Sequence, residues 1–162
     1  MTDALSPLDV AHLRESLRVA ERSRADGAHP FGAIVVDAGG EVVASFGNAS
    51  LPPEGDPTQH AELRAAAAAF RALGADGMRG STLFTSAEPC VMCAGAAYWT
   101  GIDRVVYALS ERRLLELTGA HPENPTFSLP CREVFARGQR LVEVVGPLLE
   151  DEAAVAHEGF WA

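Results

Sequence analysis

The sequence has little positive charge. Its 13 lysine and arginine residues face 22 aspartate and glutamate residues, and the formal net charge is −9. The one stretch with basic character, around Arg132, Arg137 and Arg140, is diluted by Glu133. Because nucleic-acid affinity depends mainly on clustered basic side chains, this balance argues against a large phosphate-binding surface. A small or neutral ligand suits the composition better, and we do not expect a nucleic acid as partner.

Cysteines and long apolar runs are also scarce. The chain has 3 cysteines, two of them in a Cys-x-x-Cys motif, which does not resemble a disulfide framework. No apolar run is long enough to span a bilayer, and residues 1–9 lack the apolar core of a signal peptide. We therefore expect a cytoplasmic protein without membrane contact, in which thiols stay reduced and can bind metal.

The pattern of apolar residues predicts helices that alternate with strands. We expect helices at 7–26, 61–73, 89–99, 111–117 and 148–161, strands at 30–37, 41–47, 81–86, 104–108 and 141–145, and one or two helical turns at 131–137. This order predicts an α/β fold, a three-layer α/β/α sandwich with a central mixed five-stranded sheet. With 162 residues and no repeat, linker or low-complexity tract, the chain fits one domain over residues 1–162.

Two short motifs contain the residues with the clearest chemistry, TQHAE at 58–62 and EPCVMC at 88–93. Zinc prefers four-coordinate sites built from thiolate and imidazole, and the credible ligands here are His60, Cys90 and Cys93. Three protein ligands leave one position for water, which is the pattern of a catalytic site. Both motifs fall at predicted helix starts, where the positive end of the helix favours a thiolate. We therefore expect one zinc ion per chain.

Glu62 follows His60 by two residues, so it is too near to ligate the metal comfortably in the same way. It is well placed to reach a water on the zinc, whose pKa falls from about 15.7 to about 7 when it is bound. A carboxylate there can take a proton from the water, and it can then give one to a ring nitrogen and later one to the departing ammonia. We therefore expect Glu62 to be the catalytic proton carrier of a hydrolytic deaminase.

Each motif has an ordinary alternative when it is considered alone. A single Cys-x-x-Cys also fits a redox pair or half of a zinc ribbon, and histidine and glutamate at a helix start often only cap or solvate it. Their occurrence together, in this order and at two helix starts, favours a catalytic zinc site. Cys131 has no partner near it in sequence and is interpreted as a small buried residue, with a redox or interface role as the alternative.

His-x-Glu followed by Pro-Cys-x-x-Cys is typical of zinc deaminases of nucleobases. Over residues 30–108 the chain resembles the cytidine deaminase-like superfamily, and it looks most like the guanine deaminase and tRNA adenosine deaminase branch. Residues 56–62 and the pair Tyr98-Trp99 resemble bacterial guanine deaminases, whereas tRNA deaminases have a more polar continuation and a basic surface. The resemblance implies zinc-dependent hydrolytic deamination of a purine base or nucleoside, with a guanine-type substrate favoured and ammonia released.

The resemblance also implies substrate contacts by motif position. The backbone amide of Ala61 would face the substrate, Phe31 would pack on the base, and Asn48 would hydrogen-bond the base or sugar. Trp99 could stack on a purine ring from the pocket wall. The ordinary alternatives are a core position for Phe31 and Trp99 and a turn position for Asn48.

In guanine deaminases the C-terminal part can cover the pocket and supply a further acid, and this chain departs from that pattern. Phe160 and Trp161 are candidates to close a pocket, their own or a neighbouring subunit's, with a hydrophobic anchor as the alternative. Because relatives are commonly dimers, we expect a homodimer. The candidates for a further acid are Glu116, Glu123, Glu143 and Glu158.

Three other functions stay open. A tRNA adenosine deaminase would need a basic groove for a flipped base, which the net charge of −9 disfavours. Deamination of cytosine or a triazine needs the same zinc motifs. A non-catalytic zinc-stabilised binding module would have no use for Glu62.

Overall fold

A computed structural model describes residues 5–162 of the chain. Residues 1–4, which belong to the stretch expected to lack a signal peptide, lie outside this range. Within it, no helix has the length and apolar character needed to cross a membrane. The helices are α1 (Pro7–Ala25), α2 (Ala61–Gly77), α3 (Val91–Thr100), α4 (Glu111–Thr118), α5 (Cys131–Ala136), α6 (Glu150–Ala154) and the 3-10 helix η1 (Val155–His157). The strands are β1 (Gly32–Val36), β2 (Val42–Gly47), β3 (Thr82–Ala87), β4 (Arg104–Leu109) and β5 (Glu143–Val145).

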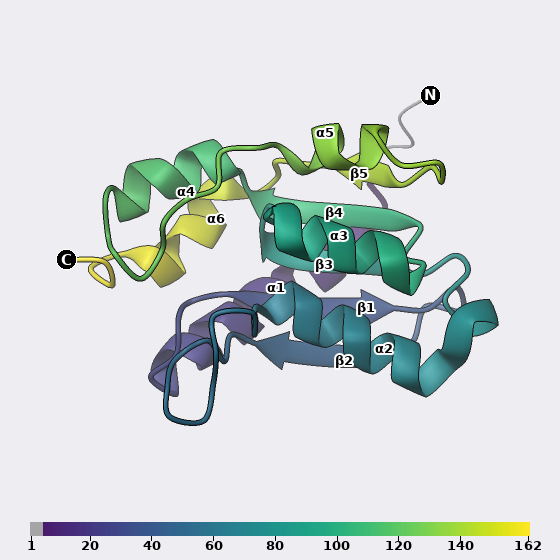
Figure 1. Cartoon of the computed structure of the whole chain (residues 1–162), viewed down its shortest axis with the longest axis horizontal. Helices are drawn as coiled ribbons and strands as arrows, with labels where there is room; N and C mark the ends of the chain where they lie inside the picture. Colours follow the sequence, from purple (N-terminus) through teal and green to yellow (C-terminus); the bar gives the residue numbers. More distant parts are fainter. Residues whose placement is uncertain (1–4) are drawn as a thin grey trace.

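The five strands form one sheet in the order β2-β1-β3-β4-β5 (Figure 1). Strand β1 pairs antiparallel with both β2 and β3, whereas β3, β4 and β5 run parallel to one another. The predicted mixed five-stranded sheet is therefore confirmed. Its parallel half brings the carboxyl ends of β3 and β4 to one edge, which is where open α/β sheets usually bind ligands.

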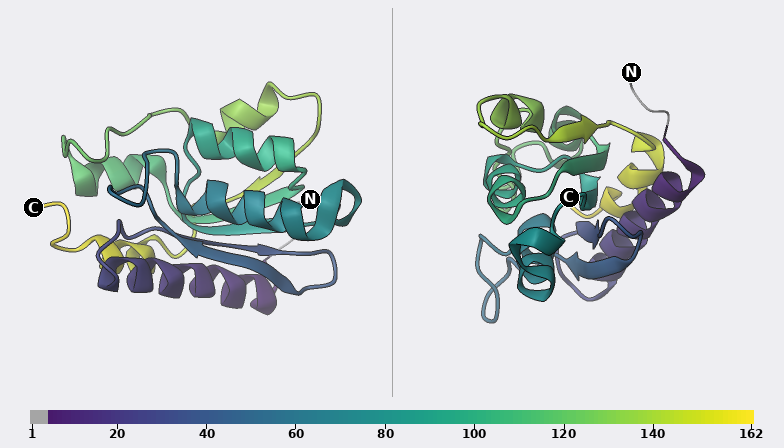
Figure 2. Two further views of the ribbon diagram at one scale, coloured as in Figure 1. Left: turned by 60° about the horizontal axis from the view of Figure 1, so that its bottom comes forward. Right: turned by 90° about the vertical axis from the view of Figure 1, so that its right-hand side faces the viewer.

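Helices cover both faces of the sheet. Helices α1 and α6 lie on one face, and α2, α3 and α5 lie on the other (Figure 2, left). Successive residues of β1 point to opposite faces, so Val35 packs towards α2 while Ile34 packs towards α1. The three-layer α/β/α sandwich predicted from the order of elements is confirmed.

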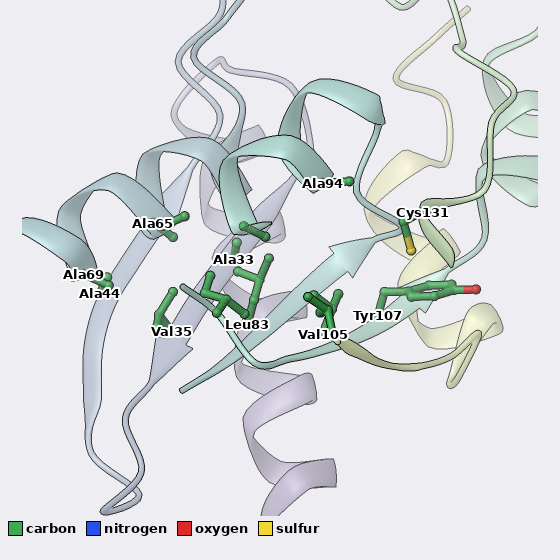
Figure 3. Packing of buried hydrophobic residues seen from close by; sticks show 14 of the residues in the cluster. Ala33, Val35, Ala44, Ala65, Ala69, Leu83, Ala94, Val105, Tyr107 and Cys131 are labelled. Carbon is green, nitrogen blue, oxygen red and sulfur yellow. The ribbon is translucent and has the colours of Figure 1, made fainter. Parts of the chain in front are cut away.

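Small side chains let α2 lie close to the sheet. Ala65 and Ala69 of α2 are completely buried and face Ala33 and Val35 of β1 in the core (Figure 3). The same core contains Cys131, which is 0% exposed at the start of α5, so its interpretation as a small buried residue is confirmed.

Helix α1 begins as its sequence predicts. Ser6 Oγ accepts a hydrogen bond from Asp9 N, and Asp9 Oδ2 accepts one from Ser6 N, both at 3.0 Å. This reciprocal cap satisfies two backbone groups that have no partner within the helix. Asp9 also pairs with Arg104 Nη1 at 2.9 Å, which ties the start of α1 to the start of β4.

Two predicted boundaries near the middle of the chain differ from the structure. Gly74 does leave helical geometry, with φ of 68°, but one further turn follows and α2 extends to Gly77. Helix α3 begins at Val91 rather than at Pro89, because Cys90 takes the extended N-cap conformation. Cys90 therefore precedes the helix and Cys93 lies in its first turn.

The predicted terminal helix at 148–161 is wrong for most of its length. Only Glu150–Ala154 and the 3-10 turn after it are helical. Gly159 has φ of 67°, and the Arg24 guanidinium donates to the carbonyl oxygens of Ala156 at 2.9 Å and Glu158 at 2.6 Å. The carbonyls that a longer helix would use internally are thus bonded to α1, and the chain turns away after this point.

His157 makes this C-terminal segment sensitive to acid. The residue is 3% exposed, and its Nδ1 accepts a hydrogen bond from Trp161 Nε1 at 3.0 Å. Burial, with a smaller contribution from Arg24, lowers the pKa of His157 from 6.5 to about 4. Because the unfolded chain binds this proton more readily, the contribution of neutral His157 to stability is complete above pH 6.5 and is lost as the pH falls towards 4.

We expect His157 alone to lower the free energy of unfolding by up to about 3 kcal/mol between pH 6.5 and pH 4. His157→Gln is the control, since glutamine can still accept a hydrogen bond from Trp161 but does not titrate. Urea unfolding of both proteins across this pH range measures the difference. An identical pH dependence in the two proteins would contradict the prediction.

Candidate functional site

Two helix starts bring the sequence motifs together. Helices α2 and α3 lie side by side on the same face of the sheet (Figure 1). His60 is the N-cap residue of α2 and Cys90 is the N-cap residue of α3, as the sequence predicted in placing both motifs at helix starts. Neither side chain caps its own helix, so the imidazole and the thiol are available to a ligand.

The donor atoms fit a zinc ion. Those of His60, Cys90 and Cys93 all lie within 4.8 Å of one another, and His60 Nδ1 is 3.7 Å from Cys90 Sγ. In a tetrahedral site with Zn–S of about 2.3 Å and Zn–N of about 2.0 Å, such a pair of donor atoms lies about 3.5 Å apart. Two thiols and one imidazole at these distances can therefore hold one zinc, with the number of protein ligands found in catalytic sites.

The two thiols differ in acidity. The pKa of the Cys90 thiol falls to about 4, chiefly because of a hydrogen bond from Cys93 and also because of His60. The pKa of Cys93 is raised, because it donates that hydrogen bond and is almost completely buried. One thiolate is thus stable next to the imidazole, which suits metal binding.

Glu62 lies in the first turn of α2 and is 5% exposed. Its Oε1 accepts a hydrogen bond from Thr85 Oγ1 at 3.1 Å, and its Oε2 lies 3.7 Å from Cys93 Sγ. Burial raises the pKa of the Glu62 carboxyl, against the opposing effect of His60. A buried carboxyl beside the donor set is in position to take up a proton and return it.

A cavity of about 760 Å³ opens beside this cluster, within the usual size of small-molecule sites. Five of the residues predicted for the zinc site and for substrate contact line it: Phe31, Asn48, His60, Glu62 and Cys90. The other lining residues are His29, Ser50, Leu51, Pro52, Pro57, Ala87, Glu88, Val91, Met92, Glu111, Leu114 and residues 122–127.

The orientation of Asn48 follows from its neighbour. Its Oδ1 accepts hydrogen bonds from Ser50 N at 2.9 Å and from Ser50 Oγ at 2.7 Å. Both bonds require the oxygen on that side, so Nδ2 is the group of Asn48 that can donate to a ligand. The side chain is nearly buried, at 7% exposed, which keeps this orientation.

The structure does not bring every predicted residue to the cavity. Trp99 is 83% exposed near the far end of α3, nine residues after Cys90, and it does not line the cavity. A helix rises about 1.5 Å per residue, so Trp99 is about 9 Å along the axis from Cys93 and about 13 Å from Cys90. Ala61 is completely buried beside His60 and is not among the lining residues.

Phe160 and Trp161 lie behind residues that line the cavity. The Trp161 ring centroid is 5.1 Å from that of His29 and 6.2 Å from that of Phe31. Phe160 contacts the same histidine, with ring centroids 5.9 Å apart. Neither residue lines the cavity itself, so within this chain they support its wall instead of closing it.

One of the four candidate acids reaches the cavity. Glu123, in the loop between α4 and α5, lines it, whereas Glu116, Glu143 and Glu158 do not. Glu143 instead pairs with Arg104 at 3.3 Å.

The sequence interpretation missed three cavity residues, His29, Glu88 and Glu111. Glu88 Oε2 accepts from Glu111 N at 3.0 Å and Glu88 Oε1 accepts from Cys131 N at 2.9 Å, so this carboxylate joins the starts of α4 and α5. Burial raises the pKa of Glu111 to about 8, with Cys90 adding to the effect. The signal that could have found both acids is their position after the carboxyl end of a strand, since Glu88 directly follows β3 and Glu111 is the second residue after β4.

A sequence profile for the cytidine and deoxycytidylate deaminase zinc-binding region matches residues 7–109. The chain belongs to this family. The predicted membership of the cytidine deaminase-like superfamily and the predicted zinc cofactor are thereby confirmed. The reaction class follows: this deaminase is a hydrolytic enzyme of the zinc-dependent family, and its own donor set fits the metal.

Relatives of this deaminase cover nearly its whole length. It is 43% identical over 157 residues to the probable cytosine deaminase of Schizosaccharomyces pombe, a match over 97% of this chain and 94% of that protein. The solved guanine deaminase of Nitrosomonas europaea is 29% identical, with a TM-score of 0.77, over 97% of this chain and 85% of the other. The protein NE0047, solved in complex with 2,6-diaminopurine, is 30% identical, with a TM-score of 0.76, over 97% and 82%.

Proposed function

We propose that this deaminase hydrolyses the exocyclic amine of a free purine base or nucleoside, with a guanine-type substrate favoured. The observation that carries the proposal is that His60, Cys90, Glu62 and Asn48 line one cavity of about 760 Å³, with the donor atom of Cys93 within 4.8 Å of those of His60 and Cys90. Solved relatives named as a guanine deaminase and as a complex with 2,6-diaminopurine support a purine.

Each group in the cavity has a proposed role. His60, Cys90 and Cys93 would hold a zinc ion, which would lower the pKa of a bound water to about 7 and so make hydroxide accessible at neutral pH. Glu62 would take one proton of the attacking water on Oε2, since Oε1 accepts from Thr85, and pass it to a ring nitrogen. It would then carry the second proton of that water to the amino group as the bond between the ring carbon and this nitrogen breaks and ammonia leaves.

The substrate ring also needs side chains that hydrogen-bond to it and pack against it. Asn48 Nδ2 would donate to an oxygen or nitrogen acceptor of the base, and Phe31 would pack against the ring. The Ala61 amide keeps its proposed role of facing the substrate, next to His60 at the start of α2. Glu123 supplies the further acid, and a carboxylate there suits the amino and ring N–H groups of a guanine-type base.

The charge of the cavity favours an uncharged ring. Glu62, Glu88, Glu111 and Glu123 line it, and no lysine or arginine is found among the described residues of its wall. A phosphate would find no basic side chain in this wall, so a base or nucleoside suits the cavity better than a nucleotide.

Two of the three arginines in the basic stretch are already bonded within the chain. Arg132 donates to Tyr107 Oη at 2.9 Å and to the Gly146 carbonyl at 2.7 Å. Arg140 donates to the Tyr98 carbonyl at 2.7 Å. These interactions leave less basic surface for tRNA and speak against the tRNA alternative.

Cytosine is the second candidate, because the relative that matches 97% of this chain is a probable cytosine deaminase. A cytosine ring is smaller than guanine but presents the same amine-bearing carbon to the zinc site. An aminotriazine also has an amine-bearing ring carbon that could face the zinc site.

Ammonia release from the zinc-loaded protein tests these choices. The panel comprises guanine, guanosine, adenosine, cytosine, cytidine, an aminotriazine and a tRNA anticodon stem. We expect the highest kcat/KM on guanine or guanosine. If activity is highest on cytosine, cytosine and not a purine is the substrate. Activity on tRNA alone would refute the substrate class. Inactivity on every compound with zinc bound would favour a non-catalytic zinc module.

Three broader features stay proposals: one domain over residues 1–162, a homodimer, and a place in the reducing cytoplasm, where the zinc-binding thiols are protected. Sedimentation equilibrium of the zinc-loaded protein would decide the oligomeric state.

A further inference from the structure

His29 makes a buried contact that the proposed reaction does not yet use. It lies between α1 and β1, is 4% exposed, and lines the cavity. Its Nε2 is 2.8 Å from Glu123 Oε2, although the two residues are 94 positions apart in the chain. We propose that His29 is a positioning residue that holds the Glu123 carboxylate at the cavity, and that Trp161 keeps this pair in place. The role rests on the proposed function, because it acts through a substrate in this cavity.

Glu123 needs such a partner. Its side chain is 51% exposed and belongs to a loop between α4 and α5 without regular secondary structure. A carboxylate on such a loop can rotate freely in water, whereas a displacement of about 1 Å in a catalytic group can cost about 100-fold in rate. The buried imidazole of His29 restricts one carboxylate oxygen and leaves the other for the substrate.

The hydrogen bonds of His29 continue to Asn48 through Ser50. Ser50 O–H donates to Asn48 Oδ1 at 2.7 Å, so Ser50 Oγ can accept from His29 Nδ1, 3.4 Å away. With Nδ1 protonated, His29 Nε2 and Glu123 Oε2 share one further proton between them. Asn48 and Glu123, the two proposed substrate partners, are therefore joined by one chain of hydrogen bonds that passes through His29, while the backbone N of Ser50 fixes the orientation of Asn48.

Trp161 contacts both groups that hold Glu123. Its ring centroid is 5.1 Å from that of His29 and 5.3 Å from that of His121. His121 Nδ1 accepts from the backbone N of Glu123 at 3.2 Å, while His29 binds the carboxylate of the same residue. Trp161 is itself fixed by its hydrogen bond to His157. Trp161 thus helps to position Glu123, although Trp161 itself does not line the cavity.

A double-mutant cycle tests the role of His29. His29→Phe keeps a ring against Phe31 and Trp161 but removes the bond to Glu123, and we expect kcat/KM for the best substrate to fall about 10- to 100-fold. In the Glu123→Gln background the same change is expected to cost nothing more, because the two residues act as one unit. His29→Gln, whose amide can donate to the carboxylate, should recover part of the lost activity.

His12→Phe is the matched control, since His12 packs on Phe84 beneath the sheet and is not among the cavity residues. It should leave kcat/KM unchanged. Trp161→Leu should lower kcat/KM in wild type and have no effect in the Glu123→Gln background.

A second measurement does not depend on turnover. In ¹⁵N imidazole spectra, the His29 resonances, assigned by their loss in His29→Phe, should shift in Glu123→Gln and in Trp161→Leu. An unshifted His29 in Glu123→Gln, or additive losses in the kinetic cycle of an active enzyme, would overturn the proposal alone. A wild-type protein that releases ammonia from no base would instead refute the proposed function, and the kinetic role of His29 with it.

Discussion

Replacing Glu62 with glutamine is expected to lower kcat/KM for deamination by about 10²- to 10⁴-fold, the usual contribution of a positioned proton carrier. Glutamine has nearly the same shape, and its carbonyl oxygen can still accept the hydrogen bond from Thr85. It cannot take a proton from the attacking water or return one to the ring. The fold and the zinc donor set should remain intact, so the loss would fall on the chemistry.

Steady-state ammonia release and zinc content, measured on the same preparations, separate these effects. Glu54→Gln, the same change at an exposed position away from the donor set, is the control and should retain full activity. Undiminished release by zinc-replete Glu62→Gln would contradict the mechanism. Loss of zinc together with activity would place Glu62 among the groups that organise the metal site.

Replacing Gly32 with alanine should have the largest effect on stability. Gly32 is the first residue of β1, and a Cβ there would lie 2.4 Å from both Ala20 N and Ser16 O, which belong to the backbone of α1. A backbone obstacle cannot rotate away as a side chain can, so α1 must move off the sheet. We expect a loss of at least about 3 kcal/mol in the free energy of unfolding, at the upper end for overpacked sites.

Gly95→Ala is the matched control for this change. Gly95 lies within α3, and a Cβ there would have nothing within 4 Å. Alanine is the better helix former, so this substitution should stabilise the protein by up to about 1 kcal/mol. Urea unfolding of the two zinc-loaded variants measures both values, and an equal effect of the two substitutions would contradict the close approach of α1 and β1.

The sheet and the metal site were predictable because their signals are local. Helices and strands that alternate along the chain indicate a layered fold. The alanines at 65–69 indicate close packing of a helix on a sheet, whichever strands the helix covers. The donor set is equally local, since His60, Cys90 and Cys93 sit in two short motifs at helix starts. Only the approach of the two motifs depends on the fold, because α2 and α3 lie side by side on one face of the sheet (Figure 1).

Residues whose environment depends on distant parts of the chain were not predictable in this way. Helix α3 is apolar almost all round, so its sequence has no period that separates a cavity face from an exposed one, and Trp99 was assigned to the wrong side. The terminal segment has helix-forming residues at 150–158, but the bonds from Arg24 to its carbonyls end the helix early.

By itself, then, the amino-acid sequence determined the layers and the zinc donors and predicted Glu62 as the proton carrier, because periodicity and ligand chemistry act over a few neighbouring residues. The tertiary structure alone decided which side chains surround the substrate cavity. It brought His29 to Glu123, placed Glu88 between the starts of α4 and α5, and set Trp161 behind the cavity wall. These contacts join segments far apart in the chain, and loop closure and packing, which no local pattern encodes, set their geometry.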